Sequence, residues 1–169
     1  MTLDYVDRRV REVLAGLGPP YELVECDPAL ADTVNFCAAY GYSMDESANC
    51  ILVQGKVDPP RLAACVVLAS TRLDVNRTVR TRLGVKKASF ADPDTTVAAT
   101  GMAIGGVTPF ALPPGLPVWV DSRVMALPRV VLGGGSRSWK VVGPPELLTA
   151  LPDVEVVDGL AVAVPAPSA

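Results

Sequence analysis

Apolar residues recur at helical spacing from Leu3 to Leu17, at the start of the chain. The pattern stops at residues 18–20, Gly-Pro-Pro, which cannot continue a helix. We therefore predict a first helix that ends at Leu17. Apolar and polar residues then alternate over residues 21–26, which predicts a strand.

Two apolar runs, residues 50–54 and 62–68, enclose a segment rich in proline and other turn-forming residues. This arrangement predicts a hairpin of two central strands. Before the first run, the Ser43-x-x-Glu46 pattern is typical of a capping box that opens a short helical turn.

Four further helices are indicated by residues at their ends. Asp32 can cap one that runs to Ala39, with Gly41 just beyond. A helix is expected from Asp74 to Leu83, followed by a short strand or extended segment over residues 85–90 and a helix from Asp92-Pro93 that ends by Gly101. Strands over residues 117–121, 129–132 and 138–142, a helix from Pro144 and a strand over residues 154–157 follow.

Helices and strands are therefore interleaved, and hairpins outnumber βαβ units in the second half. We predict an α+β fold with a mixed sheet and no internal repeat. One domain is expected over residues 1–163, followed by a flexible tail over residues 164–169.

The composition suits one domain with a substantial core. Half of the 169 residues are apolar and a fifth are charged. No apolar run approaches the roughly 20 residues that span a bilayer, and no signal-peptide pattern opens the sequence. We expect a cytoplasmic protein that does not contact a membrane.

The chain has four cysteines and no histidine. The cysteines are spaced too widely for a typical metal-ligand pattern, so no metal is expected and no cofactor is predicted. The absence of histidine removes Ser-His-Asp and Cys-His catalysis from consideration.

The net charge of −3 argues against a general nucleic-acid binder. Residues 72–87 nevertheless carry six basic groups and one acid. This cationic face fits a structured RNA touched over a small area, or it is a solvated helix face. The candidate RNA-binding residues are Arg72, Arg77, Arg80 and Lys86.

Residues 100–114 contain three glycines before three prolines, with almost no charge. Such backbone bends tightly against the core or a ligand. It lacks the Lys-Ser/Thr of a P-loop, and it follows a predicted helix rather than a strand, so a nucleotide loop is not indicated.

The segment Thr100-Gly101-Met102-Ala103-Ile104-Gly105-Gly106-Val107-Thr108-Pro109-Phe110 resembles the T-G-x-x-x-G-G-[IV]-[ST]-P-[FL] signature of the YbaK/EbsC family. That family includes Cys-tRNA(Pro) deacylases and the editing domain of prolyl-tRNA synthetase. The order of Asp27-Pro28, the Ser43–Glu46 turn, Asp92-Pro93 and residues 134–137 is also similar. The resemblance covers about residues 2–150.

The resemblance implies trans-editing, the hydrolysis of the ester that joins a wrong amino acid to tRNA. It also implies a mixed, partly barrel-like sheet with helices outside. Glycine lets backbone N–H groups approach a developing oxyanion, so Gly105 and Gly106 are catalytic candidates. The candidate substrate-binding residues are Gly101, Ile104, Val107, Thr108, Pro109 and Asp121. Thr108 and Asp121 could instead only cap turns.

The sequence departs from the family pattern at two positions. Asn49 stands where the family has a lysine, and Lys140 stands where it has an aspartate. Losing one electrostatic contact to an oxyanion costs roughly 100- to 1,000-fold in rate. We hypothesise that the cation has moved, and that Lys140 or Lys56 reaches the pocket; otherwise Lys140 is a surface residue. Asn49 remains a catalytic candidate through hydrogen bonding.

Three functions are consistent with these patterns. The favoured one is an aminoacyl-tRNA deacylase that binds the acceptor end of a misacylated tRNA. The second is a weakly catalytic module that binds tRNA, a synthetase or a small ligand. The third is a hydrolase of other small esters.

Overall fold

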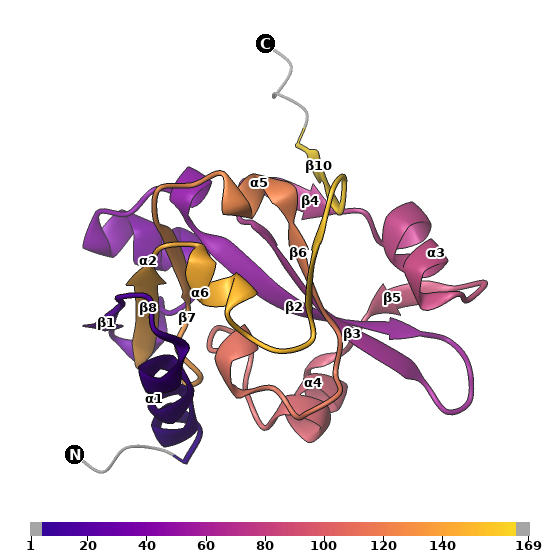
Figure 1. The fold of residues 1–169 in the computed structure, drawn as a ribbon, viewed down its shortest axis with the longest axis horizontal. Coiled ribbons are helices and arrows are strands. Elements are labelled where there is room, and N and C mark those ends of the chain that lie inside the picture. The colour runs from indigo at the N-terminus through magenta and orange to yellow at the C-terminus, as the bar shows by residue number, and fades with distance from the viewer. Residues whose placement is uncertain (1–4, 165–169) are drawn as a thin grey trace.

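The structure, a computed structural model, describes residues 5–164 (Figure 1). Its strands are β1 (Glu22–Glu25), β2 (Ala48–Gly55), β3 (Arg61–Leu68), β4 (Thr71–Leu73), β5 (Ala88–Phe90), β6 (Val118–Asp121), β7 (Val130–Gly133), β8 (Trp139–Gly143), β9 (Val154–Val157) and β10 (Ala161–Ala163). Its α-helices are α1 (Tyr5–Leu17), α2 (Thr33–Tyr40), α3 (Arg80–Leu83), α4 (Pro93–Thr100), α5 (Ser122–Met125) and α6 (Glu146–Thr149). Apart from Val164, the predicted tail lies outside the described residues.

The central sheet has the strand order β5-β2-β3-β6-β9. β2 pairs antiparallel with β5 and β3, as the predicted hairpin requires, whereas β6 lies parallel to both β3 and β9. Alternate residues of β3 enter two cores, with Val66 on one face and Cys65 and Val67 on the other. Because β3 is buried on both faces, its sequence is a continuous apolar run.

A second sheet has the antiparallel order β1-β8-β7. A parallel bridge between Ser47 and Val131 joins β7 to the segment that precedes β2. In Figure 1 this sheet lies beside α1 and α2, and α3 lies at the opposite end of the molecule. The two sheets therefore meet near the start of β2, where the pocket described below opens.

The fold is mixed α+β, as predicted, but its strands do not close into a barrel. Within the described residues they form separate sheets of five, three and two strands, the smallest being β10-β4. β4, β10 and α5 were not predicted, because elements of three or four residues are too short to show periodicity. None of the helices in residues 5–164 has the length and apolar character needed to cross a membrane.

Short polar side chains set the helix ends. Asp92 accepts a hydrogen bond from the Thr95 N–H and so starts α4, which ends where Gly101 adopts a φ of 73°. The helix predicted from Asp74 is less regular. It opens with a π-helical turn, η3 (Val75–Val79), and the Asp74 carboxylate accepts from the Thr78 hydroxyl and caps no backbone N–H.

Three short 3-10 helices complete the elements. They are η1 (Pro28–Leu30), η2 (Met44–Glu46) and η4 (Pro109–Ala111). The capping box predicted at Ser43 and Glu46 is present at η2. The glycine-rich loop, residues 101–108, connects α4 to η4 and places its middle against the β7–β8 turn.

Candidate active site

Gly106 packs the glycine-rich loop against the turn between β7 and β8. A Cβ at this position would lie 2.6 Å from the Gly135 carbonyl oxygen, closer than real Cβ contacts allow. The Gly106 carbonyl accepts a hydrogen bond from the Gly135 N–H at 2.8 Å, and the Gly106 N–H donates to the Ala103 carbonyl. Gly106 therefore shapes the loop from behind, and its N–H is already paired.

Two cationic side chains, Arg137 and Lys140, contact the glycine-rich loop at Gly105. It adopts a φ of 93°, and a Cβ there would collide with the Arg137 guanidinium. Arg137 Nη1 donates to the Ile104 carbonyl at 2.8 Å, and Lys140 Nζ donates to the Gly105 carbonyl at 3.0 Å. The N–H groups of Gly105 and Val107 have no acceptor within the described chain, so both are available to a ligand.

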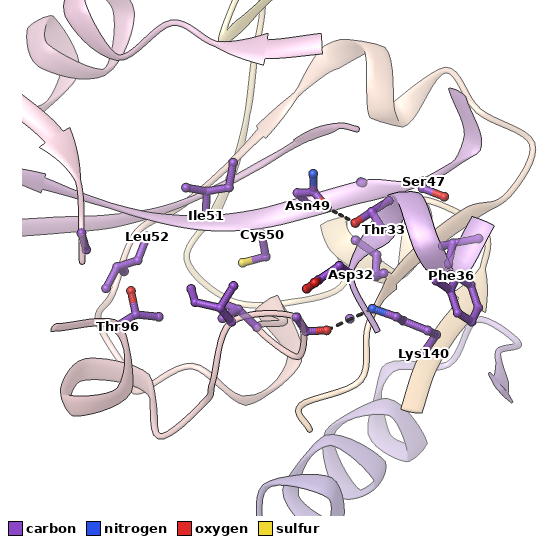
Figure 2. Close-up of a pocket in the computed structure, with 18 residues that line it drawn as sticks. Asp32, Thr33, Phe36, Ser47, Asn49, Cys50, Ile51, Leu52, Thr96 and Lys140 are labelled. Carbon is purple, nitrogen blue, oxygen red and sulfur yellow. Dashed lines mark hydrogen bonds between the residues drawn. The ribbon is translucent and has the colours of Figure 1, made fainter. Parts of the chain in front are cut away.

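A cavity of about 260 Å³ opens between α2, the start of β2, the glycine-rich loop and the β7–β8 hairpin (Figure 2). Its lining residues are Asp32, Thr33, Phe36, Ser47, Ala48, Asn49, Cys50, Ile51, Leu52, Ala91, Thr96, Ile104, Gly105, Val107, Val131, Leu132, Gly133 and Lys140. The walls are mostly apolar, with a few polar groups that converge on the interior, as is typical of small-molecule sites.

Lys140 lies on β8 and is only 6% exposed, so it is a pocket residue and not a surface residue. Its ammonium donates to the Ala31 carbonyl at 2.6 Å and to the Gly105 carbonyl at 3.0 Å. Burial lowers the pKa of Lys140 from its ordinary value. An ammonium has three donors, so one N–H remains for a ligand. Lys56 lies in the exposed segment after β2, outside the pocket lining.

Asn49 lines the pocket from β2, opposite the glycine-rich loop. Its Oδ1 accepts a hydrogen bond from the Thr33 hydroxyl at 2.7 Å. This contact fixes the orientation of the amide, and the Nδ2 group has no acceptor within the described residues. Asn49 can therefore donate a hydrogen bond to a ligand, although it supplies no charge.

Asp32 precedes α2, as predicted, but its side chain makes no capping hydrogen bond. Its Oδ1 instead accepts from Arg137 Nη1 at 3.1 Å. Arg137 also donates through Nε to the Pro28 carbonyl. One guanidinium thus ties the start of α2 to the glycine-rich loop.

Sequence reasoning did not identify Thr96 or Cys50 as pocket residues. Thr96 is 2% exposed, its hydroxyl has no partner within the described chain, and Figure 2 shows it turned into the cavity. The sequence predicts a helix around Thr96 but does not show which way the Thr96 side chain faces, so no sequence signal marked it as a pocket residue. Burial raises the pKa of the Cys50 thiol to about 12, which keeps it protonated and a poor nucleophile.

Four other candidates lie outside the pocket lining. Gly101 ends α4, and Pro109 opens η4 with its side chain buried. Thr108 is fully buried, and its hydroxyl has no partner in the part of the chain that the structure describes. The Asp121 carboxylate accepts from the Arg123 and Ala161 N–H groups, so it caps α5 and holds β10.

Three of the predicted tRNA-binding residues, Arg77, Arg80 and Lys86, lie on or beside α3 and β5, at the other end of the molecule from α2. Arg77 and Arg80 are exposed on η3 and α3, Arg72 is exposed on β4, and Lys86 is exposed just before β5. In Figure 1, α3 and β5 lie on the right, away from α2 and β8, whereas β4 lies nearer the middle, beside β10. Within residues 5–164 no group of three or more Cys, Asp or Glu side chains is placed to hold a metal ion.

One family model matches most of this chain. Residues 27–151 match the aminoacyl-tRNA editing domain. A protein described as a candidate trans-editing enzyme for prolyl-tRNA synthetase has a similar structure, with a TM-score of 0.78 and 25% identity over 93% of this chain and 98% of that one.

Two further solved structures share the fold. The hypothetical protein APE2540 has a TM-score of 0.79 and 26% identity, over 91% of this chain and 99% of that one. A scaffold protein for epitope backbone grafting has a TM-score of 0.76 and 24% identity, over 92% and 97% of the two chains. The predicted YbaK-like fold is confirmed by these matches.

Proposed function

Because the chain belongs to the aminoacyl-tRNA editing domain family, whose activity is deacylation of aminoacyl-tRNA, we propose that this pocket hydrolyses misacylated tRNA in trans. The observation that carries the proposal is the buried Lys140 ammonium beside the free N–H groups of the glycine-rich loop. A cation and preorganised donors in a water-poor site stabilise a developing oxyanion strongly.

The proposed reaction needs no enzyme nucleophile. A water molecule attacks the carbonyl carbon of the ester, and negative charge develops on the carbonyl oxygen. The N–H groups of Gly105 and Val107 and the remaining N–H of Lys140 donate to that oxygen. The bond from the carbonyl carbon to the ribose oxygen then breaks, and the ribose oxygen takes a proton from the attacking water. The products are the free amino acid and uncharged tRNA.

Asn49 and Lys140 have complementary roles in this proposal. Asn49 Nδ2 orients the ester or a ribose hydroxyl, while Lys140 supplies the charge that the family lysine would provide from β2. The cation therefore approaches from β8, across the pocket from Asn49 (Figure 2).

The likeness to a candidate trans-editing enzyme for prolyl-tRNA synthetase supports tRNA(Pro) as the first tRNA to test. The protein partner proposed for this chain is an aminoacyl-tRNA synthetase that releases misacylated tRNA. The chain and the synthetase would meet in the cytoplasm. Arg72, Arg77, Arg80 and Lys86 are the proposed contacts to tRNA phosphates.

The test is a panel of tRNA(Pro) molecules charged with small amino acids, scored for hydrolysis by wild type, Lys140→Met and Lys56→Met. We expect selective hydrolysis by wild type, a loss of about 100- to 1,000-fold in kcat for Lys140→Met, and no change for Lys56→Met. Equal turnover by wild type and Lys140→Met would contradict the role given to Lys140.

The absence of a lysine at position 49 also favours a second function, a module that binds tRNA with little hydrolysis. The same panel of charged tRNA molecules distinguishes the deacylase from the binding module. Retained tRNA binding without hydrolysis of any member would replace the deacylase by the binding module.

A further inference from the structure

We propose that Asp32 binds the α-ammonium of the aminoacyl group, so that the pocket selects esters of free amino acids and rejects N-blocked ones. Peptidyl-tRNA and formylated aminoacyl-tRNA belong to the rejected class. This inference rests on the proposed deacylase function and names the substrate feature that the same pocket reads.

Asp32 is the one carboxylate among the residues that line the cavity. It lies at the start of α2 and does not cap the helix, because Arg137 Nη1 holds its Oδ1 at 3.1 Å. The second oxygen, Oδ2, has no partner within the described chain, and the side chain is 58% exposed. Figure 2 shows the carboxylate turned toward the cavity, between Asn49 and Lys140.

The carboxylate and Gly105 line the same cavity, and Arg137 contacts both. Asp32 Oδ1 is 3.3 Å from the point that a Cβ on Gly105 would occupy. In the proposed reaction the ester carbonyl oxygen faces the Gly105 N–H and Lys140. The α-ammonium is bonded to the carbon next to that carbonyl, so in this proposal it lies on the side of the cavity where Asp32 lies.

Charge makes the proposed contact between Asp32 and the α-ammonium selective for esters of free amino acids. Lys140 and Arg137 both direct cationic groups at the glycine-rich loop, and the start of α2 adds a positive dipole end. Without Asp32 these groups would repel an ammonium. An N-acyl group removes the ammonium charge and leaves the free carboxylate oxygen without its partner, which disfavours N-blocked esters.

The test compares alanyl-tRNA with lactyl-tRNA, in which a hydroxyl replaces the ammonium, and with N-acetylalanyl-tRNA. We expect wild type to hydrolyse alanyl-tRNA with a kcat/KM about 10- to 100-fold above that for lactyl-tRNA, and to hydrolyse the acetylated ester least. Asp32→Asn should lower kcat/KM for alanyl-tRNA and leave lactyl-tRNA within about twofold, so the ratio collapses.

Asparagine is a suitable replacement because it has nearly the shape of aspartate, removes the charge and still accepts a hydrogen bond from Arg137. Asp45→Asn is the matched control, since Asp45 is exposed on η2 outside the pocket lining, and it should change neither substrate. Equal rates on alanyl- and lactyl-tRNA by wild type, or an equal loss on both in Asp32→Asn, would overturn the inference. Hydrolysis of none of the three esters would overturn the deacylase function itself.

Discussion

Lys140 is an ammonium held inside the protein by two carbonyl oxygens rather than by a carboxylate. Within residues 5–164 no ion pair neutralises its charge, and the two carbonyls fix its position against the glycine-rich loop. The energetic cost is desolvation, which also lowers the pKa of Lys140. Its charge is therefore both directed at the pocket and sensitive to pH.

We predict that kcat of the wild-type chain falls at alkaline pH with an apparent pKa below 10.5, the ordinary lysine value. The neutral amine cannot stabilise an oxyanion by charge. Lys140→Arg, whose guanidinium stays charged, should have a lower kcat but no such fall. Initial rates from about pH 7 to about pH 10, corrected for uncatalysed hydrolysis, measure this. A fall at the same pH in both proteins would assign the titration to another group.

The lowered pKa of Lys140 affects the free energy of unfolding in the direction opposite to its effect on kcat. Because the folded-state pKa of Lys140 lies below its unfolded value, the unfolded chain binds more protons between the two values. The contribution of Lys140 to the free energy of unfolding therefore rises with pH in that window. Activity and stability should thus diverge as pH increases.

Thr96 offers a hydroxyl that no group in the described chain uses. Thr96→Val conserves the shape of the side chain and removes that hydroxyl, so we predict little change in the free energy of unfolding and a fall of about 3- to 10-fold in kcat/KM. Thr149→Val, an exposed threonine on α6, is the control and should leave kcat/KM unchanged. Unaltered kinetics in Thr96→Val would remove Thr96 from the substrate contacts.

At the scale of elements, the β7–β8 hairpin organises the glycine-rich loop. Its turn packs against Gly106, and its second strand provides Lys140, while Arg137 lies between them. The start of α2 is tied to the same hairpin through Asp32 and Ala31. The pocket is therefore assembled from elements that are distant in the sequence.

We predict that Gly106→Ala lowers the free energy of unfolding by about 1–3 kcal/mol, because its Cβ would overlap the Gly135 carbonyl. Gly16→Ala is a matched control: Gly16 lies in α1 with open space around it, so alanine should stabilise the chain by about 0.5–1 kcal/mol. Denaturant unfolding of the two variants measures both changes. Wild-type stability in Gly106→Ala would show that the loop and turn are not tightly packed.

The elements could be predicted from sequence where their signals are local. The Asp92-Pro93 start, the Gly101 end and the hairpin of β2 and β3 all follow from neighbouring residues. The site depends on contacts between distant segments and could be predicted only in part. Asp32 has the sequence of an N-cap, yet Arg137, more than a hundred residues away, redirects its side chain. Lys140, one of the two lysines expected to reach the pocket, lines the cavity, but its carbonyl partners could not be foreseen.

At the scale of the whole molecule, a net charge of −3 is combined with a basic end at α3. β5 connects that end to the pocket, since Lys86 precedes the strand and Ala91, which lines the cavity, follows it. Five residues of extended chain span roughly 16 Å. An acceptor stem that lies along β5 would contact the basic end while its aminoacylated terminus enters the cavity.

The arrangement predicts how affinity for tRNA depends on salt. Replacing Arg77 and Arg80 by Gln should raise KM for misacylated tRNA by about 3- to 10-fold at low salt and leave kcat unchanged, because both side chains lie far from the reacting ester. The slope of log affinity against log salt should become shallower by about one unit per lost phosphate contact. Arg8→Gln is the control, since Arg8 is exposed on α1, away from α3 (Figure 1). If KM and the salt slope match the wild type in the double variant, these arginines form only a solvated helix face, and the acceptor stem must approach the pocket from another side.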